Sequence, residues 1–295
     1  MPSMRQIRAR IRVAKNIQQI TKAMKMVAAA RLKRAQDRVQ AARPYADRMR
    51  SVMGSLSRAG GGDFNHPLLE VREPVKVGIV AITADRGLCG SYAANILKKV
   101  AEVLRTVGPD GTAVAPENAR IIAVGRKGQA FFRRRDYPVV GEYGMNMTGA
   151  SFAEAQEIAR HAQRLYTDGE IDVLYVVYTR FLSALTQKPT VVQVLPMGAE
   201  SEGTTDGASE DYLFEPDAES LLDAMLPRSV DTLIYQALLE SIASEHGARM
   251  TAMSSATDNA GKMISNLTLS ANRARQAMIT KEIAEIVGGA DALKG

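Results

Sequence analysis

The sequence predicts an α/β protein with a long coiled coil, in which an antiparallel coiled coil of the N- and C-terminal helices accompanies a central open, mostly parallel α/β domain. Both ends of the chain carry apolar residues at helical spacing over long stretches. The middle alternates short, β-branched apolar runs with helical patterns, an order typical of a parallel sheet. Flexible or acidic stretches at 54–66 and 198–219 separate the middle from both ends.

The first predicted helix occupies residues 1–57. Between Ile20 and Leu32 its apolar steps are 4,4,4, which predicts a stutter that would locally unwind the supercoil. Pro44 predicts a bend, while the apolar spacing beyond it argues against an end of the helix. The predicted seam consists of Ile7, Ile11, Ala14, Ile17, Ile20, Met24, Ala28, Leu32, Ala35, Val39, Ala42, Ala46, Met49, Met53 and Leu56.

The second predicted helix occupies residues 217–289. Pro227 predicts a kink or a restart near its beginning, and Gly288 with Gly289 predicts a C-cap. The apolar stripe narrows toward the end of this helix, where its neighbours are Ser, Thr, Asn and Arg. This narrow stripe consists of Ile264, Leu267, Ala271, Ala274 and Met278.

The lengths of these two helices predict that they pair. At 1.5 Å per residue they span about 80 and about 90 Å, more than the diameter of any domain this chain could build. Long helices with a narrow apolar stripe need packing for stability, so the two ends are expected to form an antiparallel coiled coil. A plain structural bundle is the alternative. Small residues and methionines in the seam favour a surface that repacks against a partner.

The central domain is predicted at residues 74–197. Helical patterns at 91–106 and 151–167 alternate with its apolar runs, which are nearly continuous and therefore suit strands buried on both faces. This order predicts an open, mostly parallel, Rossmann-like sheet. Residues 198–216 contain acidic residues and no basic one, and they are predicted to be an acidic linker. The predicted strands are Val75 to Ile82, Ile121 to Val124, Val173 to Tyr178 and Thr190 to Leu195.

No catalytic, cofactor-binding or metal-binding constellation is predicted. The turns ADRGLCGS (84–91) and VGRKGQ (124–129) follow strands, where phosphate could bind, but neither has the spacing of a nucleotide-binding motif. Turn-forming glycine explains both. Cys89 is the single cysteine, with no histidine near it in sequence, and the three histidines show no metal-ligand spacing. A small-ligand α/β enzyme that uses these loops is one open alternative.

Charge is concentrated at the N-terminal end. Residues 1–50 hold 14 Lys or Arg against two Asp, a balance of +12. A basic line of Arg5, Arg8, Arg12, Lys15 and Lys22 on one helix face predicts an acidic partner surface. A basic coiled-coil nucleic-acid-binding protein is a second alternative, but no aromatic residue that could stack on bases precedes Tyr45.

Several motifs in order resemble the gamma subunit of F-type ATP synthases. The resemblance covers essentially the whole chain, and it implies a central-stalk rotor that couples proton or sodium flow through the c-ring to the catalytic beta subunits. The motifs are ITKAMKMVAAARL (20–32), DRGLCG (85–90), EHGARMTAM (245–253), ATDNA (256–260), NRARQAMIT (272–280) and EIAEIVGGA (282–290).

The resemblance also implies the partners and the location of the chain. The terminal coil would lie inside a ring of three alpha and three beta subunits, and the α/β domain would meet the epsilon subunit and the c-ring. The chain itself would be non-catalytic, bind no cofactor, nucleic acid or small-molecule substrate, and act as a peripheral membrane protein on the cytoplasmic face of a bacterial plasma membrane.

The site residues carried over from the resemblance fall into three groups. Two departures from the family pattern are Lys281, where Gln is more common, and Ala271, where an aromatic residue is common. Arg249 is expected to support the geometry of the coil. Beta-subunit contacts are expected at Met24, Lys25, Asp85, Arg86 and Cys89, and contacts to the catch regions and bearing of the ring at Arg275, Gln276, Thr280 and Glu282.

Overall fold

The computed structural model describes residues 4–59, 66–146, 149–197 and 217–292. The chain divides into two compact units. Unit 1 consists of Met1–Val27 with Met250–Gly295, and unit 2 of Ala28–Arg249. Each unit is described by itself below. The predicted acidic linker 198–216 lies outside the described residues.

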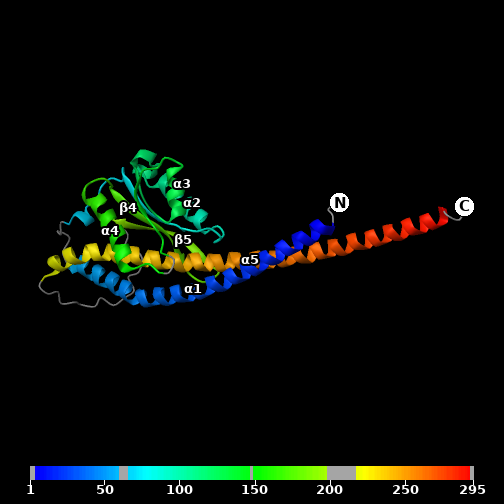
Figure 1. Cartoon of the computed structure of the whole chain (residues 1–295). Helices are drawn as coiled ribbons and strands as arrows, with labels where there is room; N and C mark the ends of the chain where they lie inside the picture. Colours follow the sequence, from blue (N-terminus) through cyan, green and yellow to red (C-terminus); the bar gives the residue numbers. More distant parts are fainter. Residues whose placement is uncertain (1–3, 60–65, 147–148, 198–216, 293–295) are drawn as a thin grey trace. The chain divides into compact units, whose positions relative to one another are not determined.

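A five-stranded sheet forms the centre of unit 2 (Figure 1). Its strand order is β3-β2-β1-β4-β5, and all neighbours are parallel except β4 and β5, which are antiparallel. Every residue of β1 is buried, as expected for a strand covered on both faces. The predicted open, mostly parallel sheet is confirmed. The strands are β1 Val77–Ile82, β2 Ala119–Val124, β3 Val139–Tyr143, β4 Val173–Phe181 and β5 Gln187–Leu195.

Helices cover both faces of this sheet (Figure 1). Helices α2 (Tyr92–Thr106) and α3 (Arg126–Arg133) pack on one face in a single apolar cluster with β1, β2 and β4. Helix α4 (Phe152–Thr167) returns the chain from β3 to β4 and bonds to helix α5 through Gln163, whose Nε2 donates to the carbonyl of Pro227 at 3.0 Å. Three single-turn 3₁₀ helices complete the unit at Pro67–Leu69, Pro109–Gly111 and Pro116–Asn118.

Two elements of unit 2 are absent from the prediction. Strand β3 is an edge strand with no fully buried residue, so its sequence VVGEY lacks a continuous apolar run. Helix α3 has eight residues, too few to show a helical period, and it begins within the stretch 124–129 that is interpreted above as a turn.

The two long helices are continuous. Helix α1 runs from Met4 to Ala59 with Pro44 inside it, and α5 runs from Ala218 to Ala292 with Pro227 inside it. The predicted C-cap at Gly288 and Gly289 is wrong, because α5 passes through both residues. Glycine costs a helix interior about 1 kcal/mol relative to alanine and does not by itself end the helix.

In unit 1 the N-terminal part of α1 runs antiparallel to α5 (Figure 1). Lys25 Nζ donates to Ser254 Oγ at 3.0 Å, and Thr257 Oγ1 donates to Thr21 Oγ1 at 2.8 Å. One turn further, Gly261 leaves room for Gln18, whose Nε2 would lie 3.1 Å from a Cβ at that position. As positions on α1 fall, their partners on α5 rise, so the predicted antiparallel coiled coil is confirmed in this unit.

The predicted stutter in α1 is wrong. The buried positions keep a regular spacing through Ala14, Thr21 and Ala28, whereas Ile17 and Ile20 are 47% and 59% exposed. The error arises because the seam holds polar residues that bond across the helices, while apolar residues occupy the neighbouring, exposed face. The buried seam positions of α1 are Ile7, Ala14, Thr21, Ala28, Leu32, Ala35, Val39 and Ala46.

Candidate partner interface

An exposed apolar stripe runs along α1 in unit 1. Its residues step by 4,3,4,3, the spacing of a coiled-coil seam, but the described part of unit 1 leaves them on the surface, with only Met24 half-buried. The chain therefore carries a second helical seam that its own partner helix does not cover. The stripe consists of Val13, Ile17, Ile20, Met24 and Val27.

Basic side chains are exposed on the same segment of α1. All five residues of the predicted basic line on α1 are exposed. Lys25, next to the stripe, is also exposed, and its ammonium donates to Ser254 of α5. This segment of α1 thus exposes both apolar side chains and cations, which suits a partner with apolar and acidic surface.

The side of α1 that faces α5 is polar at the same level. Thr21 is buried, donates to the carbonyl of Gln18 at 3.1 Å and accepts from Thr257. At this level the contacts between α1 and α5 are the pairs Thr21–Thr257 and Lys25–Ser254, so little apolar surface is buried there. The face of α1 toward α5 therefore differs in chemistry from the face that carries the apolar stripe. A rod with different faces presents a different surface in each direction.

The loop between β1 and α2 carries three of the predicted site residues. Asp85 Oδ1 accepts from the backbone nitrogens of Arg126 (3.0 Å) and Met145 (3.3 Å), so this carboxylate holds neighbouring loops together. Arg86 is exposed at the tip. Cys89 is 3% exposed, packs against Ala84 and Tyr92, and donates from Sγ to the carbonyl of Arg86. Burial raises the pKa of its thiol.

Arg249 lies on α5 beneath this loop. Its Nη2 pairs with Glu245 at 2.5 Å and donates to the carbonyl of Gly87 at 3.4 Å. The Glu245 side chain is fully buried, and burial raises its pKa, although the Arg249 charge opposes this shift. Arg249 therefore joins α5 to the loop 85–90, while its expected support of the coil geometry stays a prediction.

The predicted catch and bearing residues lie on the last turns of α5. Every described side chain from Arg275 to Gly289 is exposed, so this part of α5 is a helix surface without a covering element among the described residues. Thr280 Oγ1 donates to the carbonyl of Gln276 at 3.0 Å, a bond within the helix. Exposed apolar residues accompany the polar ones at Met278, Ile279, Ile283, Ile286 and Val287.

The carboxyl edge of the sheet is filled by α5. In open α/β folds, ligands bind where the strand order reverses, which here is between β1 and β4. At this point Glu240 Oε2 accepts from the backbone nitrogen of Phe181 at 3.3 Å, and Ser244 Oγ donates to the carbonyl of Thr179 at 3.0 Å. Tyr92 donates from its hydroxyl to the carbonyl of Ser241. Side chains of α5 occupy the position of a ligand.

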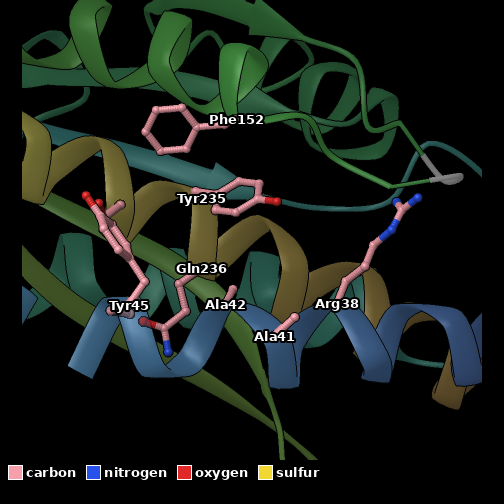
Figure 2. A pocket seen from close by; sticks show the side chains of 9 residues that line it. Arg38, Ala41, Ala42, Tyr45, Phe152, Tyr235 and Gln236 are labelled. Carbon is pink, nitrogen blue, oxygen red and sulfur yellow. The ribbon is translucent and has the colours of Figure 1, made fainter. Parts of the chain in front are cut away.

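Unit 2 also contains a cavity of about 510 Å³ between α1, α5 and the start of α4 (Figure 2). The rings of Phe152 and Tyr235 meet edge to face at 5.5 Å. No carboxylate, histidine or cysteine is among the residues that line this cavity. Its lining consists of Arg38, Ala41, Ala42, Tyr45, Ala46, Phe152, Thr232, Tyr235 and Gln236.

Metal-binding and membrane-spanning features are also absent from the described residues. Over these residues, no three His, Cys, Asp or Glu side chains gather closely enough to hold a metal ion. The helices within the same ranges include none that is long and apolar enough to cross a membrane.

Sequence reasoning missed three features of this surface. Ile17 and Ile20 were assigned to the buried seam, although the series from Val13 to Val27 is visible as a second 4,3 pattern. Leu88, an exposed leucine in the glycine loop, was read only as part of a motif. Glu245 is the first residue of the motif EHGARMTAM, but its complete burial has no sequence signal.

The sequence is similar to ATP synthase proteins over its whole length. The ATP synthase family model matches residues 3–293. The ATP synthase gamma chain of Heliobacterium modesticaldum is 50% identical over 99% of this chain and 100% of its own length. The gamma chain of Pelotomaculum thermopropionicum is 48% identical over 100% of both chains.

Solved structures share the fold. A chain of the OSCP/F1/c-ring part of the Euglena gracilis mitochondrial ATP synthase is similar with a TM-score of 0.70 and 21% identity, over 98% of this chain and 94% of that chain. A chain of the rotor of the same enzyme is similar with a TM-score of 0.67 and 20% identity, over 94% of this chain and 98% of that chain.

Proposed function

Since the chain belongs to the ATP synthase gamma chain family, we propose that it turns as the central-stalk rotor inside a ring of three alpha and three beta subunits. Rotation driven by proton or sodium flow through the c-ring would bring a different side of the coil to each beta subunit. The catalytic sites would lie on the beta subunits, and this chain would transmit the conformational change.

The observation that carries this proposal is the difference between the faces of the coil in unit 1. One face of α1 presents the apolar stripe and another the basic line, while the face toward α5 is closed at the level of Thr21 by its hydrogen bond with Thr257. A symmetric rod could not distinguish three chemically identical sites. A rod with an apolar side and a basic side favours different conformations in the subunits that these sides face.

The size of the required effect is modest. Moving a beta subunit from about 1:99 to 99:1 between two conformations takes a difference of about 5.5 kcal/mol in its contacts with the rotor. Burial of apolar surface contributes about 25 cal/mol per Å². About 200 Å² of additional apolar contact on one side would therefore supply most of this difference.

The contact residues are proposed as follows. Met24 and Lys25, with the basic line, would face the acidic C-terminal domain of beta. The loop 85–90 would meet beta through Arg86, with Asp85 and Cys89 fixing the shape of the loop. Further along α5, the contacts to the catch regions and bearing of the ring would come from Arg275, Gln276, Thr280 and Glu282.

We propose that the chain is non-catalytic and holds no cofactor. The support is the filled carboxyl edge of the sheet, where Glu240 and Ser244 take the place of a ligand. The remaining proposed partners are the epsilon subunit and the c-ring. Contact with the c-ring would make the chain a peripheral membrane protein on the cytoplasmic face of a bacterial plasma membrane.

The proposal is tested by reconstitution. The chain is expected to co-purify with alpha and beta subunits, and Lys25→Glu is expected to lower the number of protons pumped per ATP hydrolysed, because it reverses a charge at the proposed beta contact. Lys98→Glu, which reverses an exposed charge on α2, is the matched control and should leave this ratio unchanged. Equal ratios for both variants and the parent would contradict the proposed role of Lys25.

The nucleic-acid-binding alternative is not supported, because the matching family model and both gamma-chain relatives are ATP synthase proteins. The small-ligand enzyme alternative would require a free site at the loops 84–91 or 124–129. A stoichiometric ATP site on the isolated chain, detected by equilibrium dialysis, would revive it.

A further inference from the structure

Leu88 combines two unfavourable features at the tip of the loop 85–90. Its backbone φ is 65°, in the left-handed region, which costs a residue with a Cβ about 1–2 kcal/mol. Its side chain is also 60% exposed. Glycine would adopt this backbone without strain, and a polar side chain would suit the surface better. An exposed leucine held in a strained conformation indicates a contact outside the chain.

The flanks of Leu88 are rigidly held. On one side Asp85 accepts two backbone hydrogen bonds, from Arg126 and Met145. On the other side Cys89 is buried against Ala84 and Tyr92. The loop therefore has little freedom to turn the Leu88 side chain inward, and its tip keeps the shape that exposes it.

Helix α5 fixes the residue immediately before Leu88. Arg249 donates to the carbonyl of Gly87, and its guanidinium is held in turn by Glu245. Glu245 is fully buried, and the Arg249 side chain is only 11% exposed, so both members of the pair are constrained by packing. Both members of the pair lie on α5, and the hydrogen bond from Arg249 to the carbonyl of Gly87 ends one peptide bond from Leu88.

We propose that Leu88 inserts into an apolar hollow of the ring in the proposed function, and that Glu245 and Arg249 are the positioning residues that hold it there. Arg86 is exposed two residues away, so the complementary surface has an apolar hollow bordered by a carboxylate. The inference rests on the proposed rotor function, and it adds a contact residue and two positioning residues to it.

The test measures the labelling rate of a cysteine at position 88. Leu88→Cys is placed in a chain that also carries Cys89→Ala, and a maleimide is added to the isolated chain and to the complex with alpha and beta subunits. We expect labelling to slow by about tenfold or more in the complex, because thiol reactivity depends on access. Val71→Cys is the control, since Val71 is 76% exposed and precedes β1, at the other end of that strand.

The positioning residues are tested in the same complex. Arg249→Met should restore about half or more of the labelling rate at position 88, and Arg249→Lys, which keeps a cation beside Glu245, should restore less. Glu245→Gln serves as a second variant if Arg249→Met does not fold. A residue with a merely structural role would change the yield of complex without changing labelling at position 88.

Two results would overturn the inference while leaving the rotor function intact. Equal labelling at position 88 in the free chain and in an assembled complex would remove Leu88 as a contact. Protection that persists in both Arg249→Met and Glu245→Gln would remove the positioning role. Failure of the parent chain to assemble with alpha and beta would instead overturn the proposed function itself.

Discussion

Thr257 donates a hydrogen bond to Thr21 across 2.8 Å in the seam between α1 and α5. Valine has the shape of threonine without the hydroxyl, so Thr21→Val and Thr257→Val each remove this bond without leaving a cavity. Each single variant should lower the free energy of unfolding, and the double variant should lose about 1 kcal/mol less than the sum of both. Thermal unfolding of the four chains measures this coupling.

The control for this cycle is Thr280→Val. The Thr280 hydroxyl bonds only within its own helix, to the carbonyl of Gln276, among the contacts of the described residues. Its effect should therefore add to that of Thr21→Val without coupling. Additive effects for Thr21 and Thr257 as well would show that the hydroxyl pair does not stabilise the coil.

The buried carboxylate of Glu245 predicts a pH dependence of stability. Burial raises its pKa above the ordinary value of 4.5, so the folded state holds its proton at pH values where the unfolded state has lost it. The contribution of Glu245 to stability is therefore complete below pH 4.5 and declines as the pH rises through the raised pKa. In urea unfolding, the free energy of unfolding of Glu245→Gln should therefore rise relative to that of the parent as the pH rises through this window.

Asp217 provides a control of opposite sign for this experiment. Hydrogen bonds from the backbone and side chain of Ser220 lower the pKa of Asp217 below 3.8. Its contribution to stability is present above pH 3.8 and is lost as the pH falls through the lowered pKa. If the stability of the parent instead rose relative to that of Glu245→Gln as the pH rises, the argument from burial would be contradicted.

Ile20 should matter for assembly and not for the fold of the free chain. The side chain is 59% exposed, so Ile20→Ser should change the free energy of unfolding by less than about 0.5 kcal/mol. In the complex it would lose apolar contact, and the affinity for the ring should fall by about tenfold, or about 1.4 kcal/mol. Ile7→Ser, at a buried position, should destabilise the free chain and is the matched comparison.

Two truncations distinguish the part of α5 that pairs with α1 from the exposed part that follows it. Ala271 and Ala274 are the last half-buried positions of α5. Removal of residues 275–295 should leave the pairing with α1 intact and lower torque through loss of the bearing contacts, whereas removal of 265–295 should also destabilise the coil. Single-molecule torque and circular dichroism of both chains test this, and unchanged torque in both would argue against a bearing role.

The sequence predicted the elements with strong periodicity and missed those that depend on tertiary contacts. The strands β1, β2, β4 and β5 and both long helices were predicted because their apolar residues are continuous or periodic. The face of α1 was misassigned at Ile17 and Ile20, because hydrophobicity alone cannot show that Thr21 bonds to a threonine 236 positions away. The positive φ of Leu88 likewise has no signal in the hydrophobicity of the sequence.

The central claim is that both ends of the chain, wound together, turn as one rotor. The most direct test is single-molecule rotation of a complex whose coil is stapled by a disulfide between Thr21→Cys and Thr257→Cys, with the ring fixed to a surface and a probe on unit 2. We expect ATP-driven rotation in one direction, at a rate equal to that of the reduced complex. Rotation that stops when the disulfide forms and returns on reduction would contradict the claim.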